Sequence, residues 1–150
     1  MKSVFRLISP AFSDGKRIPA KYTADGKNMS PPLQWESPPV DTKSFALICD
    51  DPDAPMGNWV HWLVKNIPAN TRTIDEGAKV GVEVKNDFGK FKYGGPAPPS
   101  GTHRYFFKLY ALNVETMKAK NSHDFYKEVE EKQLATAILM GLYSRGAQDI

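Results

Sequence analysis

The stretch HRYFFKLYAL, residues 103–112, decides the fold class, because no other part of the chain alternates so clearly. Side chains of one kind recur at every second position, which is typical of a β-strand and not of a helix. His103 and Tyr105 are expected on one face of this strand, and Arg104 and Phe106 on the other. The segment therefore predicts one long strand around which the rest of the chain is arranged.

Two further strands are expected upstream. Residues 44–49 form a short apolar run, and residues 59–67 are rich in aromatic and β-branched side chains. Strict alternation divides the second strand into two sets, with Trp59, His61 and Leu63 on one face and Val60, Trp62 and Val64 on the other. Shorter strands are expected near residues 4–8 and 33–35, separated by loops rich in Pro, Gly, Asp and Asn.

One helix is expected near the C-terminus, over residues 123–143. Asn121 or Ser122 is a suitable N-cap, and Asp124 lies in the first turn, where a negative charge is favourable. The apolar side chains that recur at helical spacing are Phe125, Val129, Leu134, Ile138 and Leu142. The sequence thus predicts a mostly β protein of antiparallel strands with one C-terminal helix, in which the face carrying Ile138 is buried.

Composition limits the classes of function. A chain of 150 residues with 41% hydrophobic and 25% charged residues is typical of one globular domain, here residues 1–150. The net charge of +3 comes from scattered lysines, so no nucleic-acid partner is expected. No segment is long and apolar enough for a signal peptide or a membrane span, and we expect a cytoplasmic protein. Cys49 is the single cysteine and lies in an apolar run, so it is expected to be a buried thiol.

Polar residues that could carry chemistry gather where predicted strands begin or end, a common place for binding residues. They are the turn DPDAP at 51–55, His61, the segment YGGP at 93–96, and HRY at 103–105. Each has a structural interpretation as well: the Asp pair can form a turn, His61 can be a hydrogen-bonded core residue, and Arg104 can pair with a surface carboxylate. Taken together, two imidazoles, a phenol and a carboxylate predict a cup for a small oxyanion such as phosphate.

The same segments resemble the signature of the phosphatidylethanolamine-binding protein family, which includes the Raf kinase inhibitor protein. The matching motifs are DPDAP at 51–55, HW at 61–62, GP at 95–96 and GTHRY at 101–105, and residues 22–35 and 141–143 resemble the bacterial and archaeal branch. The resemblance implies a β-sandwich-like fold with a large antiparallel central sheet, a smaller sheet and peripheral helices. It also implies an anion pocket built from Asp51, Asp53, Pro55, His61, Gly95, Pro96, His103 and Tyr105.

These features favour a binding module for phosphate or a phosphorylated head group, with no cofactor and no catalytic residue. Asp51 is expected to orient a neighbouring histidine and to favour its imidazolium form, so that the carboxylate does not repel the anion. A cis peptide is expected at Ala54–Pro55. A regulatory, kinase-inhibitor-like role and a homodimer are left open. The alternative is an enzyme that uses Asp51, His61 and His103 for acid–base chemistry or as a metal site for hydrolysis.

Overall fold

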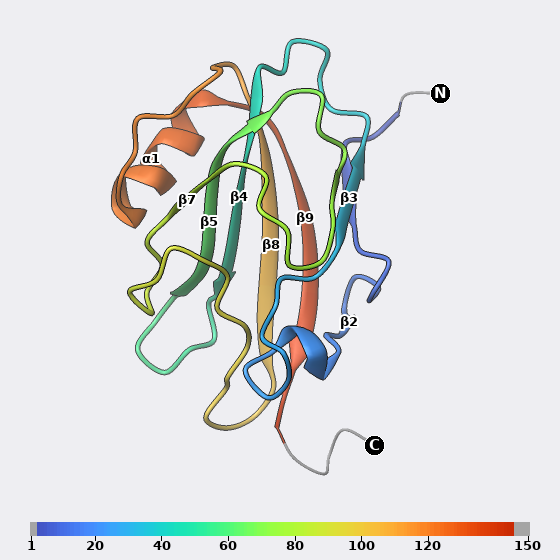
Figure 1. The fold of residues 1–150 in the computed structure, drawn as a ribbon, viewed down its shortest axis with the longest axis vertical. Helices are drawn as coiled ribbons and strands as arrows, with labels where there is room; N and C mark the ends of the chain where they lie inside the picture. The colour runs from blue at the N-terminus through green and yellow to red at the C-terminus, as the bar shows by residue number, and fades with distance from the viewer. Residues whose placement is uncertain (1–2, 146–150) are drawn as a thin grey trace.

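Two β-sheets make up most of the structure, a computed structural model that describes residues 3–145 (Figure 1). In chain order the elements are β1 (Arg6–Ile8), β2 (Lys16–Arg17), the short 3-10 helix η1 (Ala20–Tyr22), β3 (Leu33–Glu36), β4 (Ser44–Asp51), β5 (Trp59–Pro68), β6 (Thr73–Ile74), β7 (Val82–Val84), β8 (His103–Leu112), α1 (Ser122–Lys132) and β9 (Gln133–Tyr143). The large sheet has the order β2-β9-β8-β4-β5-β7 and the small sheet the order β1-β3-β6. The expectation of a mostly β fold with a large and a smaller sheet is confirmed.

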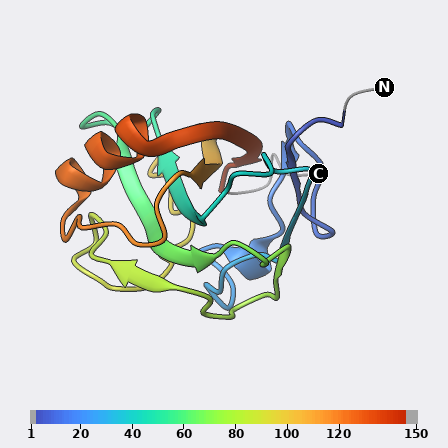
Figure 2. The same cartoon turned by 90° about the horizontal axis from the view of Figure 1, so that it is seen from above.

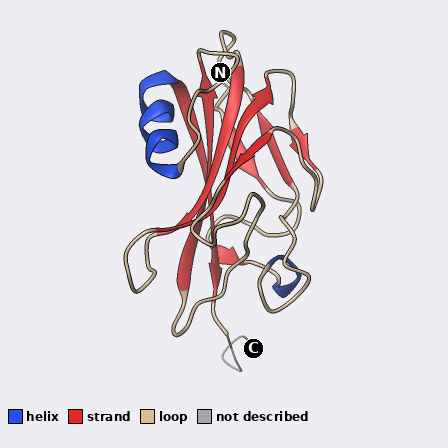
Figure 3. Ribbon diagram, turned by 60° about the vertical axis from the view of Figure 1, so that its left-hand side comes forward, coloured by secondary structure: helices blue, strands red, loops and turns tan. Residues whose placement is uncertain are grey.

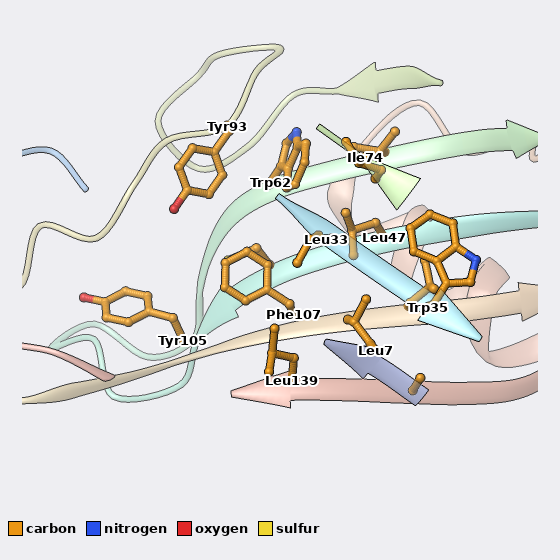
Figure 4. Close-up of a cluster of buried hydrophobic side chains, with 14 of the residues drawn as sticks. Leu7, Leu33, Trp35, Leu47, Trp62, Ile74, Tyr93, Tyr105, Phe107 and Leu139 are labelled. Atoms are coloured by element: carbon orange, nitrogen blue, oxygen red, sulfur yellow. The ribbon is translucent and has the colours of Figure 1, made fainter. Parts of the chain in front are cut away.

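The alternation along β8 produces two cores. Tyr105 and Phe107 lie in the cluster between the two sheets, together with residues of the small sheet such as Trp35 (Figure 4). Tyr110 and Leu112, on the other face of β8, lie in a second cluster beneath α1. The face of β8 between the sheets is buried along the whole strand, whereas on the other face Arg104 is exposed, Phe106 and Lys108 are half-buried, and only Tyr110 and Leu112 are buried.

In β5 the expected alternation is wrong at one place. The register with β4 shifts between Cys49, opposite Trp62, and Asp50, opposite Val60, so His61 is an extra residue in a β-bulge. As a result Val60 packs beneath α1 with Leu63, whereas Trp62 packs between the sheets. The bulge turns the His61 ring towards Tyr105, with ring centroids 5.3 Å apart.

The predicted C-terminal helix is correct in its first half and wrong in its second. The helix α1 ends at Lys132, and the chain then continues as the eleven-residue strand β9. Pairing with β8 from end to end satisfies the backbone of this segment, and this tertiary contact overrides the helical spacing of its Leu and Ile residues. Phe125 and Val129 are buried as expected, but Ile138 is 53% exposed, so its predicted burial is wrong.

The helix α1 lies on the face of the large sheet opposite the small sheet, as the rotated views show (Figures 2 and 3). Its N-cap is Asn121, whose side-chain oxygen accepts a 2.8 Å hydrogen bond from the backbone N–H of Asp124. Tyr126 anchors the helix to the sheet by donating to the carboxylate of Asp50 on β4. None of the helices within residues 3–145 is long and apolar enough to cross a lipid bilayer.

Candidate functional site

A cavity of about 210 Å³ lies at one end of the large sheet, where β4 and β5 are joined and β8 begins. Asp51, His61, His103 and Tyr105 all line it, together with Pro55. The remaining wall is largely apolar and consists of Ala54, Met56, Trp59, Phe88 and the segment 97–99. The structure therefore brings together the two imidazoles, the phenol and the carboxylate that the sequence suggested as a cup.

Asp51 and His103 form the central contact of this cavity. The Nδ1 of His103 lies 2.6 Å from Oδ2 of Asp51, and both side chains are buried. The other oxygen of Asp51 accepts a 2.7 Å hydrogen bond from the backbone N–H of Asp53. Both carboxylate oxygens are thus engaged, and the His103 ring is fixed with its Nδ1 towards Asp51. The described residues offer no hydrogen-bond partner to Nε2 of His103, which leaves that atom for a ligand.

His61 is held in a different way. Its Nδ1 lies 2.6 Å from the carbonyl oxygen of Gly94, which can only accept, so the ring carries its hydrogen on Nδ1. Burial lowers the pKa of His61 below the ordinary value of 6.5, and the neutral ring is therefore favoured at neutral pH. In this form Nε2 is an acceptor, which suits a protonated oxygen or an ammonium hydrogen better than a bare anion.

Tyr105 supplies a hydroxyl at the end of the core. Figure 4 shows its ring at the edge of the buried cluster with the oxygen pointing away from the other labelled side chains. Burial is the main cause that raises the pKa of Tyr105, with the negative charge of Asp51 as a second cause, so the hydroxyl keeps its hydrogen. Within residues 3–145 it has no hydrogen-bond partner, and it can therefore donate to a bound oxyanion.

Asp53, Gly95 and Pro96 do not line the cavity, but they hold its walls. Asp53 accepts two side-chain hydrogen bonds from Arg104, at 2.9 and 2.8 Å, and one from the Arg104 backbone. These hydrogen bonds are the main reason that the pKa of Asp53 is lowered to about 2. The interpretation of Arg104 as the partner of a surface carboxylate is confirmed.

Gly95 and Pro96 belong to the segment that leads into the apolar wall. The N–H of Gly95 donates to Oδ1 of Asn28 at 2.7 Å, and the carbonyl oxygen of Pro96 accepts from the N–H of Ala24 at 3.0 Å. A side chain at position 95 would collide with the carbonyl oxygen of Tyr22 at 2.6 Å, so only glycine fits there. The two residues thus fasten the wall to the loop that follows η1.

The expected cis peptide at Ala54–Pro55 is wrong, because no peptide bond among the described residues is cis. The chain reverses its direction in this turn through Gly57 instead. Gly57 has a φ of 103°, in the region that favours glycine, and its N–H donates to the carbonyl oxygen of Ala54 at 3.0 Å. The trans isomer is the intrinsically preferred one, and this turn closes without the alternative.

Phe88 is a site residue that the sequence did not reveal. Its ring lies edge-on to Trp59 and His61, with centroids 5.5 and 5.2 Å away. Asn86 holds the loop that carries it, because its side-chain oxygen accepts from the backbone N–H groups of Phe88 and Lys90. Phe88 stands in a polar segment without periodicity, close to Phe91 and Tyr93, and no local pattern distinguishes it from these neighbouring aromatic residues.

The alternative of a metal site finds no support in the donor set. Within residues 3–145 no three His, Cys, Asp or Glu side chains are placed so that they could hold a metal ion. The Nδ1 of His61 is used by Gly94, and one oxygen of Asp51 by His103. Cys49 is buried, as expected, and burial raises the pKa of its thiol, so it is not a nucleophile at neutral pH.

Comparison with known proteins agrees with this architecture. The family model described as phosphatidylethanolamine-binding protein matches residues 8–144, which is nearly the whole chain. The chain belongs to the phosphatidylethanolamine-binding protein family. Both the family and its fold were expected from the motifs at the ends of the strands.

Relatives in this family span archaea and bacteria. A UPF0098 protein of Methanothermobacter thermautotrophicus is 46% identical over 149 residues, which cover 93% of this chain and 99% of that protein. The Escherichia coli UPF0098 protein YbhB is 43% identical over 73% of this chain and 79% of its own length. The structure of the phosphatidylethanolamine-binding protein homologue CT736 from Chlamydia trachomatis superposes with a TM-score of 0.90 at 36% identity, over 97% of this chain and all of that one. E. coli YbcL, a member of the same family, gives 0.89 at 31% identity, over 96% of this chain and all of its own.

Proposed function

We propose that this protein is a binding module whose cavity takes a small oxyanion, either free phosphate or the phosphoryl part of a head group. The observation that supports the proposal most directly is the 2.6 Å contact between Asp51 and His103, in a cavity that Tyr105 also lines. When both ring nitrogens of His103 carry a hydrogen, Nδ1 donates to Asp51 and Nε2 is a second donor. Two donors, Nε2 of His103 and the hydroxyl of Tyr105, are then available to one anion.

The carboxylate of Asp51 is compatible with an anion in the cavity. Its two oxygens already accept hydrogen bonds from His103 and from the backbone of Asp53, so neither needs a donor from the ligand. The apolar wall that includes Trp59 and Phe88 excludes water and lowers the local dielectric constant. Charged hydrogen bonds are stronger in such surroundings than in water.

We infer binding and not catalysis as the role of this cavity. The hydroxyl and thiol groups that could act as nucleophiles are poorly placed, because Cys49 is buried in the core and Ser100 is an exposed loop residue outside the cavity lining. A regulatory, kinase-inhibitor-like role has no support beyond the family resemblance, and a cytoplasmic location stays a prediction of the sequence.

The proposal is tested by titrating the protein with inorganic phosphate and with phosphoethanolamine in a calorimeter. His103→Gln removes the imidazole ring but keeps a polar side chain. We expect at least about a tenfold loss of affinity for both ligands, because a hydrogen bond to a charged group such as the anion contributes on the order of 1.5–3 kcal/mol. His123→Gln is the matched control, because His123 lies at the start of α1, away from the cavity, and this variant should bind as the unaltered protein does.

Two outcomes would contradict the proposal. One is that the unaltered protein binds neither ligand at millimolar concentration. The other is that the His103→Gln variant binds with unchanged affinity while its circular dichroism spectrum remains native. Binding of phosphoethanolamine but not of phosphate would assign the cavity to the head group as a whole.

A further inference from the structure

One ring nitrogen of His61 faces the cavity without a partner. Its Nδ1 contacts the carbonyl oxygen of Gly94 at 2.6 Å, so Nε2 lies on the far side of the ring. Among the described residues, the buried side-chain atoms that lack a hydrogen bond are Nε1 of Trp35 and Oδ1 of Asp50. Nε2 of His61 is not one of them and has no partner in this part of the chain, so it is accessible from the cavity that the ring lines.

The form of the ring makes this nitrogen an acceptor. Because a carbonyl oxygen can only accept, the contact with Gly94 places the hydrogen of the neutral ring on Nδ1. Burial lowers the pKa of His61. The negative charges of Asp51, Asp50 and Asp87 act in the opposite direction but do not reverse the shift. A ligand that reaches Nε2 must therefore bring a hydrogen of its own.

The ligand atom next to His61 belongs to the same group that Tyr105 contacts. The ring of Tyr105 lies 5.3 Å from that of His61 and 6.3 Å from that of His103, measured between centroids. All three rings line one cavity of about 210 Å³. A phosphoryl group that accepts a hydrogen bond from the Tyr105 hydroxyl is thus within reach of Nε2 of His61 as well.

The charge of the cavity limits the charge of its ligand. Of the described residues that line it, none is Lys or Arg, and Asp51 is among them. Even when His103 is protonated, the carboxylate of Asp51 at 2.6 Å balances its charge. A second negative charge on the ligand would therefore enter an apolar site without a compensating cation, which is unfavourable.

We propose that the cavity selects a phosphoryl group with one negative charge and one hydrogen, and that this hydrogen is donated to Nε2 of His61. The inference rests on the proposed function and narrows it to free phosphate and phosphomonoesters in their monoanionic form. A phosphodiester has the same charge but no such hydrogen. Sulfate has two negative charges and no hydrogen at neutral pH. His61 is thus the residue that determines specificity.

The discrimination should be large because it depends on a mismatch. An anion without a hydrogen would place an oxygen lone pair against the lone pair of Nε2. His61 is only 3% exposed, so little water can reach the ring to take the place of the missing donor. A site built to hydrogen-bond one group rejects an analogue that lacks it, because its buried polar atom is left unpaired.

Calorimetric titrations at pH 6.5 and constant ionic strength test this inference with four ligands, namely phosphate, monomethyl phosphate, dimethyl phosphate and sulfate. Dihydrogen phosphate and dimethyl phosphate have the same charge, but only the first can donate a hydrogen. We expect the unaltered protein to bind phosphate at least about tenfold more tightly than dimethyl phosphate or sulfate. Either preference between phosphate and monomethyl phosphate agrees with the inference and identifies the source of the phosphoryl group.

A substitution at His61 tests whether this residue makes the selection. In His61→Gln the amide can turn either its N–H or its oxygen to the ligand. The ratio of affinities for phosphate and dimethyl phosphate should therefore fall at least about threefold. His123→Gln is the matched control, because it makes the same change at the start of α1, outside the cavity lining, and it should leave the ratio unchanged.

The outcomes separate this inference from the proposed function. Equal affinity of the unaltered protein for phosphate, dimethyl phosphate and sulfate would overturn the inference but leave anion binding intact. Failure of all four ligands to bind would overturn both. An unchanged ratio in a His61→Gln variant with a native circular dichroism spectrum would reject His61 as the selecting residue.

Discussion

At the scale of single residues, Asp50 and Asp51 show how one strand supplies two unrelated sites. Asp51 points into the cavity and contacts His103, whereas Asp50 points to the other face and accepts from Tyr126 and Lys108. The alternation of a strand alone sends two neighbouring carboxylates to opposite sides of the sheet. The residue that contacts His103 in the cavity and the residue that attaches α1 are thus neighbours in sequence.

His61 gives a prediction on the pH dependence of stability. Its pKa in the folded protein is lowered by burial, so between that pKa and 6.5 the unfolded chain binds more protons than the folded one. The free energy of unfolding should therefore fall as the pH drops below 6.5 and should stop falling on this account below the folded pKa. Urea unfolding at several pH values between 5 and 7.5 measures this slope.

The slope should become smaller in His61→Asn, which cannot titrate, and should persist in His123→Gln. If His61→Asn kept the full slope, another group would be responsible for the pH dependence. The absolute stability of His61→Asn is not the relevant quantity, because this substitution also changes packing against Tyr105 and Phe88.

At the scale of elements, α1 buries a large apolar side chain at Phe125, whereas β9 leaves Ile138 partly exposed. One substitution in each element should therefore have a different effect on the free energy of unfolding. The side chain of Phe125 on α1 is fully buried between the helix and the large sheet, whereas the side chain of Ile138 on β9 is half exposed. Phe125→Ala should lower the free energy of unfolding by about 3–5 kcal/mol, as is usual for buried aromatic residues. Ile138→Ala should cost about 1 kcal/mol or less in dilute solution, because little of its surface is removed from water on folding.

Denaturant unfolding at low protein concentration measures both costs. Equal losses for the two variants would contradict the assignment of Ile138 to an exposed strand face. Such a result would instead favour the continuous helix over residues 123–143 that the spacing of apolar residues suggests.

At the scale of the whole molecule, occupation of the cavity should stabilise the fold. A ligand that binds only the folded state adds about 2.7 kcal/mol at a concentration of 100 times its Kd, which for a domain of this size raises the melting temperature by roughly 5–10 °C. We expect this shift with phosphate for the unaltered protein and for His123→Gln. His103→Gln should show a much smaller shift in the same buffer, measured by differential scanning calorimetry at matched ionic strength.

The sequence by itself determined the strands β4, β5 and β8 and their relation to the site. Residues 103–112 form β8 as expected, because alternation of apolar side chains is a local property that burial on a sheet enforces. The four residues Asp51, His61, His103 and Tyr105 converge as expected, because each lies at or near the end of a strand that joins the same sheet. The family motifs pointed to the same fold.

Only the tertiary structure decided the rest. Residues 133–143 have a spacing that suits a helix, and they became a strand because β8 offered an edge along which every backbone group could pair. The bulge at His61 exists because β4 and β5 differ by one residue in their pairing, and no single strand contains that information. Phe88 contacts His61 because Asn86 holds the loop that carries it. The two residues are far apart in sequence, so no local pattern predicts this contact. Local sequence sets which backbone conformations are favourable, but the pairing partner chooses among them, because its hydrogen bonds and buried surface outweigh differences in propensity.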